Sequence, residues 1–360
     1  MTSRPLDIIL LIIDAVGTEE TSHATLSACA LTCRAMRRHS QVLLFNTVWL
    51  STAKQCELFA ATIHEKPEYG RLVERIIMEW RIDCALSRDE LDDHPLPPHV
   101  VARLTSLKAA EFIDAAAEYS PTTVPLLFCQ TFGSLATMTE LMLQSIVFEE
   151  PGDMVQFLWS CPYVQSLNLA GCRICADYDP ETDVLPTDER HPRLHQALTS
   201  LTVDASLPIA FALSPMWGDM IVSLSMEVGV AHSSEHLAGL AHFTRLRSLT
   251  LRLSSIEDYS IFWEHMLCYV SAPSIQEVIV KLWLFYCEPK TTRLITSAFT
   301  LGEGSTNVLT TWQRLEKVVW VLRYYASENL DKCEAAAREV EEKVPASWLR
   351  SRFTCKVDTT

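Results

Sequence analysis

A spacing of apolar residues at offsets 0, 3 and 5 recurs nine times between residues 73 and 320, and it constrains the fold more than any other feature. The alternation at its last two positions is typical of a β-strand that buries one face in a core. The starts of successive copies lie 23 to 40 residues apart, which leaves room for one strand and one helix per unit. The nine copies are Val73-Ile76-Met78, Leu104-Leu107-Ala109, Met138-Leu141-Leu143, Val164-Leu167-Leu169, Leu198-Leu201-Val203, Ile221-Leu224-Met226, Leu246-Leu249-Leu251, Ile275-Val278-Val280 and Leu315-Val318-Trp320.

Capping residues and apolar spacing predict helices in several gaps between these strands. They cover Met154–Trp159 behind a cap at Asp153, the segment from Ser233 or Ser234 to His242, and the segment from Ser255 to Val270. Strands joined through helices pair in parallel and place the helices on one side of the sheet. The sequence therefore predicts an α/β fold in which residues 51–325 form an irregular leucine-rich solenoid, with parallel strands on one side and helices on the other.

The first 50 residues differ in pattern from the rest. Nearly every residue from Asp7 to Val16 is apolar, so a helix at this place would need to be buried on all sides. A second helix is expected over Ala24–Arg38, followed by a third segment over Val42–Leu50. A module of this size cannot enclose its first helix unaided. Either the first repeat or a partner protein is therefore expected to cover part of this three-helix module at residues 1–50.

Residues 326–360 are expected to close the other end of the solenoid. A capped amphipathic helix is predicted over Asn329–Val344, followed by Pro345, and a last strand over Trp348–Val357. Such a cap shields apolar side chains that the last repeat would otherwise expose.

Charge and cysteine content narrow the expected partners and compartment. The net charge of −15 repels phosphate backbones and attracts basic partners, so we expect no binding to nucleic acid. Twelve cysteines without regular spacing, and no Asn-x-Ser/Thr acceptor, favour reduced thiols in the cytoplasm or nucleus. The longest apolar runs are shorter than the ~20 residues that a membrane span needs, so no membrane association is expected.

Carboxylates gather in two stretches between the predicted strands, at residues 83–99 and 177–192. Charge runs of this kind are usually solvated loops. The alternative is that these two stretches form part of a recognition surface for basic segments of another protein.

One cysteine–histidine set has the spacing of a zinc site. Cys172 and Cys175 are followed at a suitable distance by His191 and His195. Pro192 interrupts the helix that a zinc finger needs between its histidines. Cys172 also fits the turn position that follows Leu167 and Leu169 in a leucine-rich repeat. We therefore expect no metal, and the carboxylates from Asp177 onward lack the glycine of a calcium loop.

No motif of a known catalytic class is present. The ten glycines form no phosphate-binding loop, and no nucleophile elbow or zinc-protease helix signature occurs. We expect no catalytic residues and no cofactor. A cryptic hydrolase or metal-dependent enzyme assembled by folding remains an alternative.

Residues 4–50 resemble an F-box of the divergent kind common in fungal families. The first part of the resemblance lies in Pro5, Leu6, Asp7, Ile8, Ile9, Ile12 and Ile13, the second in Leu31, Thr32, Cys33, Arg34, Ala35 and Met36, and the last in Leu44 and Phe45. Arg4 and Met36 stand where the family usually has Leu and Trp. Irregular leucine-rich repeats are a usual companion of this box.

The resemblance implies a substrate-recognition subunit of a cullin–RING ubiquitin ligase. The box would dock on a Skp-type adaptor through Pro5, Leu6, Ile8, Ile9, Ile12, Leu31, Cys33 and Arg34, and the repeats would bind an unknown target protein. The alternative is a leucine-rich scaffold or recognition protein with no tie to ubiquitination, whose first helices merely cap the solenoid.

Overall fold

The computed structural model describes residues 10–11, 13, 23–80, 96–114, 131–132, 135–148, 151–174, 197–204, 214–228, 239–253, 270, 272–284, 312, 314–324, 334–335, 337–338, 341–342 and 352–359. The chain divides into two compact units, the first made of residues 1–149 and 153–164 and the second of residues 150–152 and 165–360. Within the described ranges, no helix combines the length and the apolar character that crossing a membrane requires.

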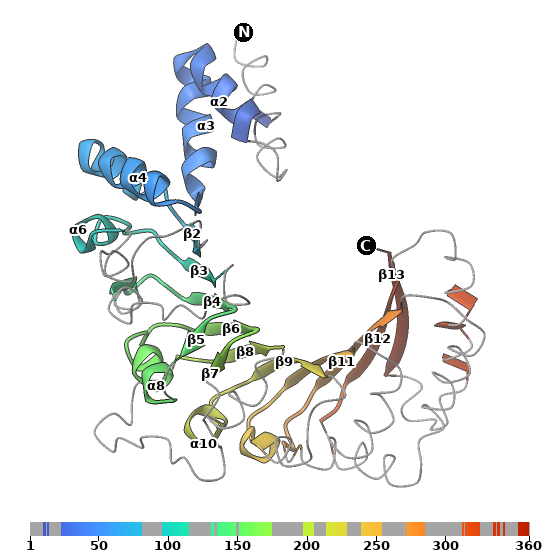
Figure 1. Cartoon of the computed structure of the whole chain (residues 1–360). Helices are drawn as coiled ribbons and strands as arrows, with labels where there is room; N and C mark the ends of the chain where they lie inside the picture. The colour runs from blue at the N-terminus through green and yellow to red at the C-terminus, as the bar shows by residue number, and fades with distance from the viewer. Residues whose placement is uncertain are drawn as a thin grey trace. The chain divides into compact units, whose positions relative to one another are not determined.

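Eleven strands of the described residues form one open parallel sheet, and their order in the sheet follows their order in the chain (Figure 1). They are β1 (Thr47–Leu50), β2 (Arg75–Trp80), β3 (Ala109–Asp114), β4 (Glu140–Gln144), β6 (Ser166–Ala170), β8 (Ser200–Val203), β9 (Ser223–Val228), β10 (Ser248–Leu253), β11 (Glu277–Leu284), β12 (Lys317–Tyr324) and β13 (Phe353–Thr359). The short strands β5 (Val147–Phe148) and β7 (Arg173–Ile174) are not part of this sheet. The α/β class and the parallel sheet are thus as predicted.

The predicted triplets form the core of the sheet. Every residue of the nine triplets is buried. Eight triplets also hold the expected register: for example, Leu249 and Leu251 of β10 lie beside Leu224 and Met226 of β9. Each strand thus contributes the same two inward positions, which is how parallel strands stack side chains into a continuous core.

The triplet expected at Leu104 starts three residues later in the structure, at Leu107. Strand β3 begins at Ala109, and its Ala110 lies beside Ile76 of β2 and Leu141 of β4. The copy that matches the other strands is therefore Leu107-Ala110-Phe112. Leu104 is buried as well, but it belongs to the turn that leads into the strand.

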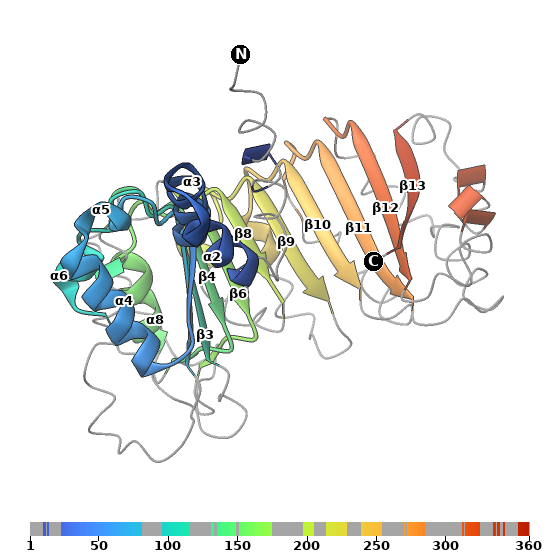
Figure 2. The same cartoon turned by 90° about the horizontal axis from the view of Figure 1, so that it is seen from above.

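In the first unit, α4 (Ala53–Glu65), α6 (Pro98–Val101) and most of α8 (Pro151–Trp159) lie on one side of β1–β4, and α5 (Pro67–Gly70) follows α4 (Figure 2). Helix α4 begins where Thr52 Oγ1 accepts a hydrogen bond from the backbone N–H of Gln55, 3.2 Å away, which satisfies an orphan donor of the first turn. Cys56, Phe59 and Ile63 share one face of α4 and are buried against the sheet side.

In the second unit, β6 and β8–β13 carry short helical segments between them, among them α10 (Ser214–Trp217) and η2 (Gly239–His242). Strand β10 shows the pattern common to these strands. Its Leu249, Leu251 and Leu253 are buried, whereas its Ser248 and Arg252 are partly exposed. One face of the strand packs in a core, and the other carries polar side chains.

Several predicted boundaries are corrected by the structure. The helix expected over Ala24–Arg38 is two helices, α2 (His23–Thr32) and α3 (Arg34–Asn46), because Cys33 has extended backbone angles of φ −154° and ψ 167°. The third segment of the module is not one element: α3 ends at Asn46 and Thr47–Leu50 pair with β2.

Two further helix and strand ends differ from expectation. Helix α8 begins at Pro151, so Asp153 lies in its first turn and is not its N-cap; a carboxylate there still favours the helix dipole. The C-terminal strand expected near Trp348–Val357 is present as β13 but starts at Phe353. Of the helices expected over Ser233–His242 and Ser255–Val270, most residues lie outside the described ranges.

Candidate interaction surfaces

The structure describes three of the eight residues expected to dock on an adaptor. Leu31 lies in the last turn of α2, Cys33 separates α2 from α3, and Arg34 begins α3. All three side chains are exposed, Leu31 to 80%. Pro5, Leu6, Ile8, Ile9 and Ile12 lie outside the described residues.

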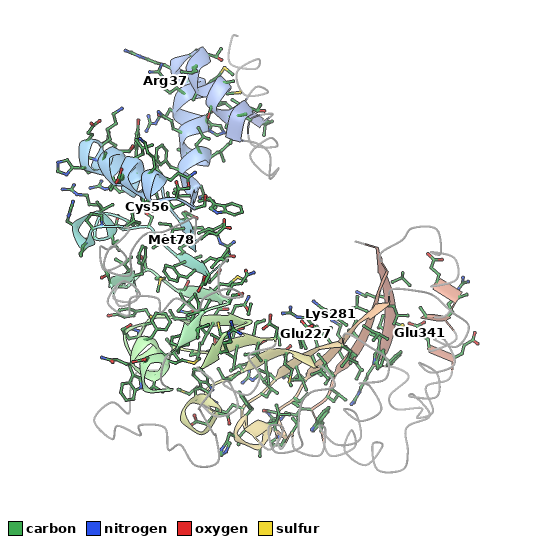
Figure 3. The ribbon with its side chains drawn as sticks, in the orientation of Figure 1. Arg37, Cys56, Met78, Glu227, Lys281 and Glu341 are labelled. Carbon is green, nitrogen blue, oxygen red and sulfur yellow. The ribbon has the colours of Figure 1, made fainter. Side chains whose placement is uncertain are left out.

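The junction of α2 and α3 is held by polar contacts from the chain itself. Arg37 Nε donates to the Ala30 carbonyl across the break, at 3.1 Å (Figure 3 labels Arg37), and Thr32 Oγ1 donates to the Ala28 carbonyl at 3.1 Å. The bond from Arg37 satisfies the Ala30 carbonyl, one of the last four of α2, which have no backbone partner within the helix. Leu31 is thereby presented on an ordered helix end.

Apolar side chains of this helical region are partly covered and partly exposed. Ile13 and Leu26 are each 2% exposed, so both side chains are covered within the chain. Leu11, in contrast, is 67% exposed, like Leu31 beyond it in sequence. The expectation that the first helix is buried on all sides therefore does not hold for Leu11 within this chain.

A second surface lies in the first unit, on the face of β1–β4 opposite α4, α6 and α8; we call it the first outer face. One row across the four strands consists of Trp49, Ile77, Glu111 and Met142. The next row contains Glu79, Ile113 and Gln144. Trp49 is 57% exposed, and its Nε1–H donates to Glu79 Oε2 at 3.2 Å.

The corresponding face of the second unit, which we call the second outer face, is rich in hydroxyl groups. Ser166, Ser200, Ser223 and Ser248 lie side by side in one row, and the next row holds Asn168, Thr202, Ser225 and Thr250. Arg252 Nη2 donates to Ser225 Oγ at 3.3 Å. Glu227 and Lys281 lie on the same face, on either side of Arg252 (Figure 3).

An exposed ion pair occurs in each unit next to these rows. Lys108 Nζ lies 3.0 Å from Glu74 Oε2, and Lys317 Nζ lies 2.6 Å from Glu277 Oε1. The hydrogen bond from Lys108 lowers the pKa of the Glu74 carboxyl below its usual value. Exposed pairs of this kind contribute little to stability. Their main effect is to hold a carboxylate and an ammonium group in place beside the rows.

Buried thiols in the described residues are poor nucleophiles. Burial raises the pKa of Cys161 to about 12 and that of Cys56 to about 11. Cys355 is only partly buried, but its desolvation, reinforced by the Glu341 carboxylate, raises its pKa to about 12. These thiols are protonated at neutral pH and pack as small apolar side chains.

Cys172 occupies the repeat turn that the sequence assigned to it. It is 2% exposed and follows Gly171, whose φ of 62° is left-handed. The other three residues of the candidate zinc set, Cys175, His191 and His195, lie outside the described residues. Within the described ranges, no cluster of three or more His, Cys, Asp or Glu side chains could hold a metal ion.

Sequence reasoning places the target surface on the strand side of the repeats, but it misses the contribution of Trp49 to the first outer face. The sequence places Trp49 at the end of the helical module, whereas it lies on β1, an edge strand of the sheet. The alternation of Val48, Trp49 and Leu50 could have indicated a strand here. Its outward-facing residue, Trp49, has the largest side chain of the three. The hydroxyl rows also had a signal, since Ser or Thr fills the outward positions of three consecutive predicted strands.

The described surfaces offer exposed apolar side chains and ordered rows of polar groups, which suit protein recognition. No protein-family model and no curated protein matches this sequence.

Proposed function

We propose that this chain is a non-catalytic substrate receptor of a cullin–RING ubiquitin ligase. Its first 50 residues form an F-box-like module that docks on a Skp-type adaptor, and the strands behind it form an irregular leucine-rich solenoid that binds a target protein. The contribution to catalysis is positional: holding the target near a conjugating enzyme raises its effective concentration without new chemistry.

The observation that carries the proposal is the exposure of Leu31 on the ordered end of α2. Leu31 is 80% exposed, and Cys33 and Arg34, two and three residues later, are exposed as well; all three belong to the second part of the box. Leu11 is exposed in the same region. Burying a large aliphatic side chain against a partner removes apolar surface from water, which stabilises the complex.

The outer faces supply the second half of the proposal. A receptor needs a surface for its target that is separate from the adaptor surface. Both outer faces carry ordered, partly exposed side chains on strands held in register by neighbouring strands. Rigid strands present such groups with little loss of conformational entropy on binding.

Binding to a purified Skp-type adaptor tests the proposal. We expect the full chain to bind, and Leu31→Asp to weaken binding at least ~10-fold, as for the central residue of an interface. Leu58→Asp is the matched control, because Leu58 is an exposed leucine on α4, outside the module. Failure of the wild type to bind, or equal binding by Leu31→Asp and Leu58→Asp, contradicts the proposal. The double variant Ile9→Asp, Ile12→Asp extends the test to the first part of the box.

A second function, a leucine-rich scaffold with no tie to ubiquitination, is favoured by a different observation. Helix α3 continues directly into β1, which pairs with β2 as the first strand of the sheet. Ile13 and Leu26 are also buried within the chain. These features suit helices that cap a repeat array. In that case no adaptor binds, while target binding by the outer faces remains.

A further inference from the structure

We propose that the first outer face binds an extended segment of a partner protein whose sheet-facing side chains, at every second residue, are in turn basic and apolar. This segment would be the part of the target protein that the receptor recognises. That this face is the target-binding surface rests on the proposed function. The face lies wholly within the first unit.

The arrangement of one row requires a cation from the partner. Glu111 of β3 lies between Ile77 of β2 and Met142 of β4. Any partner that covers Ile77 and Met142 must also take Glu111 out of water. An isolated buried carboxylate is costly unless it is paired. A partner with a Lys or Arg side chain at this place satisfies both demands, whereas a neutral partner leaves Glu111 unpaired.

Trp49 provides a second place for a cation. The hydrogen bond from its Nε1–H to Glu79 holds the indole on this face, and 57% of the residue remains exposed. The face of an indole ring attracts Arg and Lys side chains, and a nearby carboxylate strengthens that attraction. Trp is also among the residue types enriched at interface hot spots.

Spacing and net charge agree with an extended segment. Neighbouring strands lie about 4.8 Å apart, so the row from Trp49 to Met142 spans roughly 14 Å across four strands. A few residues of extended chain cover that length, with alternate side chains directed toward the sheet. The chain's net charge of −15 also draws basic segments toward it at low salt.

The second outer face differs at the same positions. Where the first outer face has Trp49, Ile77 and Met142, the second has Asn168, Thr202 and Ser225 in the corresponding row. Hydroxyl groups remain well solvated and make no apolar anchor. Farther along this row Ile279 and Val319 are direct neighbours on β11 and β12, with no carboxylate between them. The basic, apolar segment is therefore assigned to the first outer face.

Fluorescence anisotropy with labelled peptides and the full chain tests the inference. The probe is the peptide Arg-Ser-Leu-Ser-Arg, whose Arg and Leu side chains share one side of an extended chain. The comparison peptides are the acidic Glu-Ser-Leu-Ser-Glu and the serine peptide Arg-Ser-Ser-Ser-Arg. We expect the first to bind, the acidic peptide not to bind, and the serine peptide to bind more weakly. Equal binding of the leucine and serine peptides would overturn the apolar half of the proposal.

Variants separate a specific site from general attraction of cations. Trp49→Ala is expected to weaken the probe at least ~10-fold, and Trp49→Phe, which keeps a ring but loses the bond to Glu79, by less. The controls are Leu58→Ala, whose side chain is equally exposed at 57%, and Glu65→Gln on α4, matched to Glu111→Gln. The inference fails if each variant behaves like its control. Equal weakening by Glu111→Gln and Glu65→Gln, together with equal binding by Trp49→Ala and Leu58→Ala, would mean that only net charge attracts the peptide.

Adaptor binding by the same variants distinguishes this inference from the proposed function. Trp49→Ala should bind a Skp-type adaptor as the wild type does. Loss of adaptor binding in the wild type, with Trp49-dependent peptide binding retained, overturns the ligase function alone. Adaptor binding without Trp49-dependent peptide binding overturns the inference alone.

Discussion

The rings of Phe112 and Phe132 meet edge to face, with their centroids 5.5 Å apart and an interplanar angle of 74°. Both residues are fully buried. Phe112 is the inward residue of β3, and Phe132 comes from the chain between β3 and β4. The pair therefore ties a strand of the first unit to the segment that connects it to the next strand.

Replacing Phe112 with alanine should destabilise the first unit by about 3–5 kcal/mol, through lost burial and the cavity left behind. Chemical denaturation followed by circular dichroism measures the change. Ile113→Ala is the matched control, because Ile113 is the next residue of the same strand and lies on the first outer face, partly exposed. An equal loss for both variants would show that the inward and outward faces of β3 are assigned incorrectly.

The residue after strand β4 and the residue after strand β6 share a left-handed backbone. Ser145 has a φ of 58° and Gly171 a φ of 62°, and each is followed by a buried residue, Ile146 or Cys172. A side chain in this conformation costs roughly 1–2 kcal/mol, which glycine avoids at some cost in chain entropy. Ser145→Gly should therefore stabilise the protein by roughly 0.5 kcal/mol, and Gly171→Ser should destabilise it by about 1 kcal/mol. Thermal unfolding measures both; destabilisation by Ser145→Gly would contradict the expectation.

The strands were predictable because their inward residues are large and evenly spaced. The exception, β3, shows where that reasoning reaches its limit. Both Leu104-Leu107-Ala109 and Leu107-Ala110-Phe112 satisfy the same spacing, and all five of these side chains are buried. Alanine is too weak an apolar signal to choose between the two phases. The register became clear from Ala110 lying beside Ile76.

Helix boundaries and the candidate sites were less predictable. The break at Cys33 has no Pro or Gly, and Leu26, Cys29, Ala30 and Cys33 keep an unbroken helical spacing. The strand Thr47–Leu50 is too short for its alternation to outweigh the helix before it. The row of Trp49, Ile77, Glu111 and Met142 is assembled from four strands, so its chemistry follows from register and not from any local motif.

The carboxyl of Glu74 owes its lowered pKa chiefly to the hydrogen bond from Lys108. Lys108→Met should raise that pKa toward the ordinary value of 4.5, which NMR titration of the glutamate side chains can follow. Because the folded pKa is the lower one, the pair stabilises the fold above about pH 4.5 and loses this effect as the pH falls. Lys66→Met removes an exposed lysine elsewhere in the unit and should leave Glu74 unchanged. An unaltered Glu74 pKa in Lys108→Met would contradict the assignment.

Cys161 should make the protein less stable at alkaline pH. Its pKa is raised by burial from 9.0 to about 12, so the folded thiol stays protonated in a range where the unfolded thiol ionises. Between these values the unfolded state binds fewer protons, and the free energy of unfolding falls by up to about 1.4 kcal/mol per pH unit. Below pH 9 this contribution is fully present.

Cys161→Ala removes the titrating group, so its free energy of unfolding should fall less steeply above pH 9 than that of the wild type. Val164→Ala, a packing change three residues away, should keep the wild-type slope. Identical slopes for Cys161→Ala and the wild type in urea denaturation between pH 8 and pH 11 would mean that this thiol is accessible to water in the folded protein.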